Sequence, residues 1–205
     1  MASVSLHNSG TGETGVTKRY WIAGLVGGLA MYVWMSIAHI ATPLGATGIS
    51  MISAEEPLLT SMTAVLGDKP GLYMFPSMDP AAPMQEYEKK LAANPSGLLI
   101  YRRAGALALE PTQLVGELIA EIVMVLLGVW LLSKAALSSF GARLGFFCIV
   151  GLVASLWTNF SYWNWYTFPT SYTVTSVFTE FVGFLVAGLV IAAMLGRGQS
   201  KRTMT

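Results

Sequence analysis

Charged residues are scarce in this sequence, where they occupy 11% of 205 positions; a soluble globular domain carries roughly 25%. The net charge is only +1, so the chain lacks the strongly basic surface that attracts a nucleic acid backbone. Its Lys and Arg residues stand mainly at the ends of apolar runs rather than in basic patches. We therefore expect no nucleic acid partner, and we expect the lipid bilayer to surround most of the chain.

Cysteine and histidine are almost absent as well. The single cysteine, Cys148, excludes both an intramolecular disulfide and a CxxC redox or zinc motif. Only His7 and His39 carry imidazole rings, so the membrane helices lack two axial histidines for a haem. The sequence also lacks a Ser-His-Asp set, a phosphate-binding glycine loop and a nucleophile elbow. It therefore assigns neither a cofactor nor a catalytic residue.

Long apolar runs take the place of these features, and hydrophobic residues make up 54% of the chain. Four runs reach the roughly 20 residues that a transmembrane helix needs, at 20–41, 114–133, 144–166 and 172–195. The first is longer than the apolar core of a signal peptide, about 7–15 residues, so we expect it to stay uncleaved. The predicted fold is an all-α integral membrane protein, a four-transmembrane-helix bundle with a small mixed α/β insert at 42–113.

Basic residues indicate how this bundle is oriented. Cytoplasmic loops are enriched in Lys and Arg, and four spans place seven such residues on one side: Lys18, Arg19, Lys134, Arg143, Arg197, Lys201 and Arg202. The tails at 1–19 and 196–205 are therefore predicted to be cytoplasmic, and the insert extracytoplasmic. The first tail is rich in Gly, Ser and Thr, which predicts disorder. The compact length and short loops favour a bacterial inner (plasma) membrane.

The insert carries structural signals of its own. Ser53 and Glu56 form an S-x-x-E capping-box pattern, which predicts a helix that continues to Leu66. Glycine precedes each of two short segments of extended character. A second helix and these two extended segments are predicted at 83–93, 72–75 and 98–101. We expect the insert to fold into a small cap that rests on the outer mouth of the bundle.

Three carboxylates inside the apolar runs are the strongest functional signal: Glu117, Glu121 and Glu180. An ionisable group at membrane depth is costly and usually faces the bundle interior. Helical periodicity and a rise of about 1.5 Å per residue place these carboxylates in the outer half of the bundle. Other polar residues fall on the same faces, namely Ser36, His39, Asn159 and Tyr162. We therefore expect one outward-facing polar pocket that binds a ligand or a proton.

Three glutamates in one low-dielectric volume would not all be ionised at neutral pH, so at least one is expected to hold a proton. Structural roles compete with this interpretation. Glu180 could form an interhelical hydrogen bond with Asn159 or Ser155, and Glu117 could extend to the lipid headgroups. A metal site at Glu121, Glu180 and His39 is a weak candidate, because the Glu-x-x-His pairs of a dinuclear carboxylate centre are missing.

Small residues and aromatic residues make two further predictions. Gly24 with Gly28, and Gly188 with Ala192 and Gly196, have the small-xxx-small spacing of closely packed membrane helices. The aromatic residues at 157–168 crowd the outer end of the third span. They suit an interfacial belt, and the alternative is a flat wall for a lipid- or quinone-like ligand.

Three functions are compatible with these patterns. The first is an accessory membrane protein that binds a small cation, a proton or an amphipathic ligand at the carboxylate cluster. The second is a proton- or cation-coupled transporter subunit in a homo-oligomer or a membrane complex, because four spans rarely enclose a path alone. The third is a membrane enzyme that uses a glutamate as acid or base on a lipid-like substrate. The spans carry no charged residue in their inner halves, which counts against transport.

Overall fold

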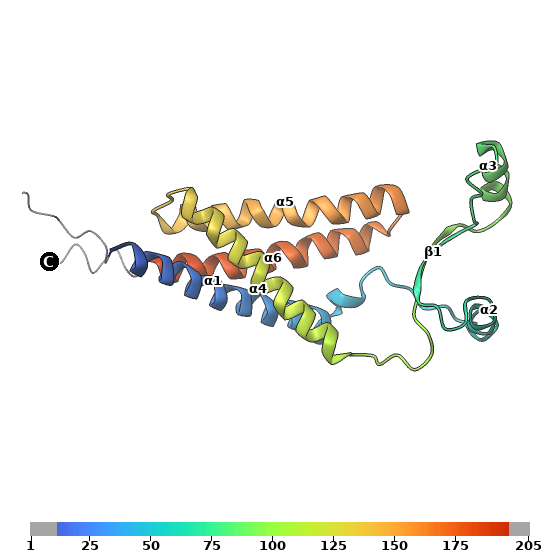
Figure 1. The fold of residues 1–205 in the computed structure, drawn as a ribbon, viewed down its shortest axis with the longest axis horizontal. Helices are drawn as coiled ribbons and strands as arrows, with labels where there is room; N and C mark the ends of the chain where they lie inside the picture. The colour runs from blue at the N-terminus through green and yellow to red at the C-terminus, as the bar shows by residue number, and fades with distance from the viewer. Residues whose placement is uncertain (1–11, 197–205) are drawn as a thin grey trace, which may run out of the picture.

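The computed structural model describes residues 12–196, and four long helices dominate it (Figure 1). All four are long and apolar enough to cross a membrane. They are α1 (Gly12–Ser36), α4 (Pro111–Lys134), α5 (Phe140–Tyr166) and α6 (Thr170–Gly196). Between α1 and α4 lie α2 (Glu56–Leu66), β1 (Gly71–Phe75), α3 (Met84–Ala93) and β2 (Gly97–Tyr101). The predicted four-helix membrane bundle with a small mixed insert is therefore confirmed.

The first membrane helix starts earlier than its apolar run. α1 begins at Gly12, so residues 12–19, which were predicted to belong to a disordered tail, are helical. Extending an existing helix costs far less than nucleating one, because each added residue gains a hydrogen bond. At its other end α1 passes into a π-helical turn, η1 (Ile37–Ala41), and then a 3₁₀ turn, η2 (Pro43–Ala46). The predictions for 1–11 and 197–205 fall outside the described residues.

Local sequence signals define both ends of α5. The Ser139 hydroxyl oxygen accepts a hydrogen bond from the Ala142 backbone N–H at 3.1 Å and caps the first turn. Thr167 ends the helix in the left-handed conformation, with φ 55°. Pro169 follows two residues later, and proline cannot continue a helix. The chain therefore reverses within a few residues, which makes α5 and α6 antiparallel neighbours.

Glycines set how closely α1 approaches α4. α1 lies between α4 and α6, and α5 packs along α6. A Cβ atom at Gly28 would lie 2.8 Å from the Ile122 Cα, and one at Gly24 would lie 2.8 Å from the Leu126 side chain. The predicted close packing at both glycines is confirmed, and at Gly28 only glycine fits, because the atom it would meet belongs to the backbone.

Two reciprocal contacts between glycine and phenylalanine join α5 to α6. Phe184 of α6 covers Gly151 of α5, where an added Cβ would lie 2.5 Å from the Phe184 Cβ. Phe147 of α5 covers Gly188 of α6, with a corresponding distance of 2.7 Å. The close packing predicted at Gly188 is confirmed, whereas a Cβ at Gly196 would meet no atom of residues 12–196 within 4 Å. These contacts fix the spacing of the α5–α6 pair.

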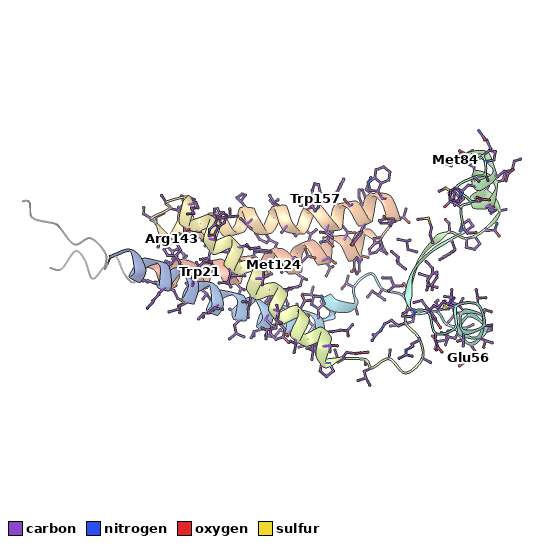
Figure 2. All side chains as sticks on the ribbon, in the orientation of Figure 1. Trp21, Glu56, Met84, Met124, Arg143 and Trp157 are labelled. Atoms are coloured by element: carbon purple, nitrogen blue, oxygen red, sulfur yellow. The ribbon has the colours of Figure 1, made fainter. Side chains whose placement is uncertain are left out.

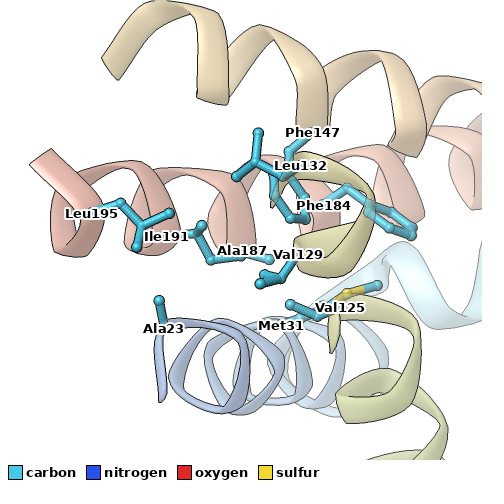
Figure 3. Packing of buried hydrophobic residues seen from close by; sticks show 10 residues of the cluster. All are labelled: Ala23, Met31, Val125, Val129, Leu132, Phe147, Phe184, Ala187, Ile191 and Leu195. Atoms are coloured by element: carbon cyan, nitrogen blue, oxygen red, sulfur yellow. The ribbon is translucent and has the colours of Figure 1, made fainter. Parts of the chain in front are cut away.

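The apolar core lies between the long helices, from their middle toward the end remote from the insert, and Figure 3 shows its packing. It contains Ala23, Met31, Val125, Val129, Leu132, Phe147, Phe184, Ala187, Ile191 and Leu195, drawn from all four long helices. Large apolar side chains such as Trp21, Met124 and Trp157 cover the outside (Figure 2), as expected for faces that contact lipid. Nearer the insert, several buried side chains are polar instead, among them Glu121, Ser155, Asn159 and Thr179.

The insert contains the predicted elements with small shifts in their bounds. β1 and β2 form an antiparallel pair, in which Gly71 lies opposite Tyr101. The predicted capping box is wrong, because α2 begins only at Glu56 and no side chain caps it. Pro57 explains the later start, since proline is pre-organised for the first helical turn.

The prediction that the insert rests on the bundle is also wrong. Its helices and strands extend beyond the end of the bundle (Figure 1), and none of their residues lines either of the two bundle cavities described below. Large apolar side chains of the insert remain uncovered; Val65 is 81% exposed and Ile100 is 76% exposed. Segments without helix or strand, at 47–55 and 102–110, connect the insert to the bundle, so short connections do not hold it against the mouth.

Candidate functional site

A cavity of about 260 Å³ lies at the insert end of the bundle, between η1, η2, α5 and α6. We call it the Glu180 cavity. Its polar lining consists of His39, Thr158, Asn159, Tyr162, Tyr172, Thr175, Ser176, Thr179 and Glu180. Met35, Leu44, Gly45 and Ile49 complete the wall. The structure thus brings together four residues of the predicted site: Glu180, Asn159, Tyr162 and His39.

Glu180 is held in this cavity by an interhelical hydrogen bond. The Asn159 amide Nδ2 lies 3.0 Å from each carboxylate oxygen of Glu180. The same amide donates to the Ser155 carbonyl oxygen at 2.8 Å, which fixes its direction on α5. The predicted contact between Glu180 and Asn159 is therefore present. A neutral amide orients the carboxylate and brings no positive charge to it.

The strength of this contact can be tested with a double-mutant cycle on Asn159→Leu and Glu180→Leu. We expect a coupling free energy of about 1 kcal/mol, in the range found for hydrogen bonds between membrane helices. Unfolding of the two single variants and the double variant in mixed micelles, followed by circular dichroism, gives this value. Additivity within roughly 0.3–0.5 kcal/mol would show that the two residues do not interact.

His39 belongs to the π-helical turn η1, a distortion that often occurs at functional sites. Its ring Nδ1 lies 2.9 Å from the Met35 backbone carbonyl oxygen. A carbonyl oxygen only accepts, so Nδ1 must carry the hydrogen in this bond. When the ring is neutral, Nε2 therefore holds the free lone pair. His39 can take up a proton or accept a hydrogen bond at Nε2.

A second cavity lies on the other side of η1, between α1, α4 and the segment that enters α4. It measures about 290 Å³, and we call it the Glu117 cavity. Its lining consists of Tyr32, Met35, Ser36, His39, Ile40, Leu109, Leu114 and Glu117. The predicted residues Ser36 and Glu117 are found here, and His39 lines both cavities. The polar residues expected in one pocket thus line two neighbouring cavities that share Met35 and His39.

Glu121 lines neither cavity, although the sequence grouped it with the other two glutamates. Its side chain is fully buried at 0% exposure. Neither of its carboxyl oxygens has a hydrogen-bond partner among the described residues. A buried charge without a partner is strongly unfavourable. Glu180 receives a hydrogen bond that would stabilise its ionised form, whereas Glu121 receives none from the described residues.

The aromatic residues of the α5–α6 turn divide into two groups. Tyr162 stacks on Phe168 with ring centroids 5.3 Å apart, and Phe168 meets Tyr172 edge-on at 5.4 Å. Tyr162 and Tyr172 also line the Glu180 cavity, so this group forms an aromatic wall beside it. Trp157 and Trp165 are 81% and 77% exposed, as residues of an interfacial belt would be.

Sequence reasoning missed several hydroxyl groups of the Glu180 cavity. Thr175 and Thr179 stand one turn apart on α6 beside Glu180. The signal that could have found them is the crowding of Ser and Thr in the first half of an otherwise apolar helix. On the other hand, the described residues hold no group of three or more His, Cys, Asp or Glu side chains placed to bind a metal. The structure therefore does not assemble Glu121, Glu180 and His39 into a metal site.

Comparisons with protein-family models, with curated proteins and with solved structures find no match to this chain. The chemistry of the site therefore rests on its own residues. The Glu180 cavity offers one carboxylate, several hydroxyl acceptors and two tyrosine rings. This set accepts hydrogen bonds and attracts positive charge.

Proposed function

We propose that this protein binds a small primary ammonium compound in the Glu180 cavity. The observation that carries the proposal is the state of the Glu180 carboxylate, which receives only the neutral Asn159 amide. The one ion pair among the described residues, Arg102 with Glu110, belongs to the segment before α4. A carboxylate inside a membrane bundle calls for a positive partner, and a bound ammonium group would supply it.

The rest of the cavity suits the same ligand. An ammonium group has three N–H donors and no acceptor. Beside the carboxylate, the hydroxyls of Thr175, Ser176 and Thr179 provide acceptors. Tyrosine rings attract cations placed over their faces, and the rings of Tyr162 and Tyr172 lie in the wall. The apolar Met35, Leu44 and Ile49 side chains would contact a short alkyl tail.

The experiment compares three compounds of the same size and different charge: propylammonium, 1-propanol and propionate. Binding to the purified protein in detergent is measured by isothermal titration calorimetry. We expect saturable binding of propylammonium, at least tenfold tighter than that of 1-propanol, and no binding of propionate. The proposal is wrong if propylammonium does not bind or binds no better than the neutral alcohol.

We further propose that the Glu180 cavity faces the outside of the cell, so that the ligand enters from there. Lys134 and Arg143 flank the α4–α5 turn, at the end of the bundle opposite the insert (Figure 1). The excess of basic residues in cytoplasmic loops supports a cytoplasmic location for this end, with both chain termini on the same side. The Glu180 cavity then faces the exterior of a bacterial inner membrane. Transport receives less support, because the described spans have no carboxyl or imidazole group between the glutamates and the opposite end.

A further inference from the structure

Glu121 has a property that ligand binding at Glu180 does not explain. The side chain is completely buried, and both carboxyl oxygens lack a partner in the described part of the chain. The residues one and two turns further along α4, Val125, Gly128 and Val129, are buried and apolar. An ionised carboxylate in such surroundings would be left without solvation or a counter-ion. A carboxylic acid that keeps its proton avoids this cost.

Glu117 stands one helical turn from Glu121, on the side of the insert. Residues four apart on a helix lie on the same face, so the Glu117 and Glu121 side chains are neighbours on α4. The Glu117 side chain is exposed and lines the Glu117 cavity. A protonated Glu121 can therefore donate to an ionised Glu117, and hydrogen bonds from an acid to a carboxylate are among the strong ones.

We infer that Glu121 and Glu117 form a proton-binding site, in which Glu121 stores the proton and Glu117 exchanges it with water in the Glu117 cavity. A proton leaves a hydronium ion, attaches to a Glu117 carboxylate oxygen and passes to Glu121, and release follows the reverse order. The other titratable groups near this path are Tyr32 of α1 and His39 of η1. Beyond η1 lie Glu180 of α6 and Tyr162 of α5.

The buried residues beyond Glu121 on α4 are apolar, so no proton path continues from this site along the helix. The proton enters and leaves on the insert side only. His39 lines both cavities, so it stands between this pair and the Glu180 cavity. The proton site itself does not depend on ammonium binding and is tested without any ligand.

Infrared spectroscopy of the purified protein at neutral pH provides the test, because a protonated carboxyl group gives a distinct C=O stretching band. We expect this band in the unmodified protein, its loss in Glu121→Gln, and its retention in Glu86→Gln, which makes the same change on helix α3. A spectrum of the unmodified protein without any such band would overturn the inference without the need for a variant.

Exchange with D₂O tests the role of Glu117. The C=O band of a protonated acid shifts when deuterium replaces the proton, so the rate of the shift reports proton exchange. In Glu117→Gln we expect the band to remain and its shift to slow by at least tenfold, because an amide does not take up and release a proton. An unchanged rate in this variant, or a band that survives in Glu121→Gln, would refute the assignment.

Discussion

Replacing Gly151 with valine is expected to separate α5 from α6 and to cause the largest loss of stability of any change proposed here. An added Cβ would lie 2.5 Å from the Phe184 Cβ and 2.9 Å from its ring carbon Cγ. The Phe184 Cβ is fixed to the backbone, so no rotation of the side chain relieves the overlap. We expect a cost of about 3 kcal/mol, the upper end of the usual range for overpacking.

The chain offers a matched control on the same helix. No atom of the described residues lies within 4 Å of where a Cβ on Gly145 of α5 would be, so Gly145→Val makes the same chemical change on an open face. Both variants are unfolded with increasing SDS in mixed micelles and followed by circular dichroism. Gly145→Val should match the unmodified protein, and equal midpoints for the two variants would mean that α5 and α6 do not pack through Gly151.

The same substitution should also damage the Glu180 cavity. Asn159 lies eight residues beyond Gly151 on α5, which is about 12 Å along the helix. Its hydrogen bond to Glu180 spans the interface that Gly151 and Phe184 hold together. A wider spacing breaks this bond, so Gly151→Val should lose propylammonium binding even under conditions in which the protein stays folded.

Glu180→Gln is expected to weaken the binding of propylammonium by about 10- to 100-fold, while the fold survives. The substitution keeps the size of the side chain and an oxygen that accepts from Asn159, and it removes only the negative charge. Hydrogen bonds that involve charged groups are worth about 1.5–3 kcal/mol, and each 1.4 kcal/mol is a factor of about ten in the dissociation constant.

Glu86→Gln is the control for this prediction, because it removes one negative charge from α3 of the insert, which lines neither bundle cavity. Calorimetric titration should give unchanged affinity for this variant. If both variants weaken binding equally, the effect comes from the overall charge of the protein and not from a contact at Glu180. If neither does, the ammonium group binds elsewhere.

Particular residues show how far sequence patterns reach. A Glu in a long apolar run marks an interior position because a charge in lipid is costly. This holds for Glu121, which is fully buried, but not for Glu117, which is exposed. Helical rise correctly placed Asn159 and Glu180 at the same depth, since their side chains meet at 3.0 Å. The start of helix α2 in the insert was predicted wrongly. Ser53 has the residue type of a helix cap, but Pro57 favours a start nearer to itself.

The sequence alone thus determined how deep each polar residue lies along its helix and how long the apolar spans are. It also determined the small-residue spacing at Gly24 and Gly28. These are local properties, set by the chemistry of each residue and the rise of a single helix. Only the tertiary structure decided that η1 divides the polar residues between two cavities, that Glu121 is isolated from both, and that the insert leaves the mouth uncovered. Those outcomes depend on the rotation and spacing of helices against one another, which contacts such as Phe184 on Gly151 fix only when the whole bundle is assembled.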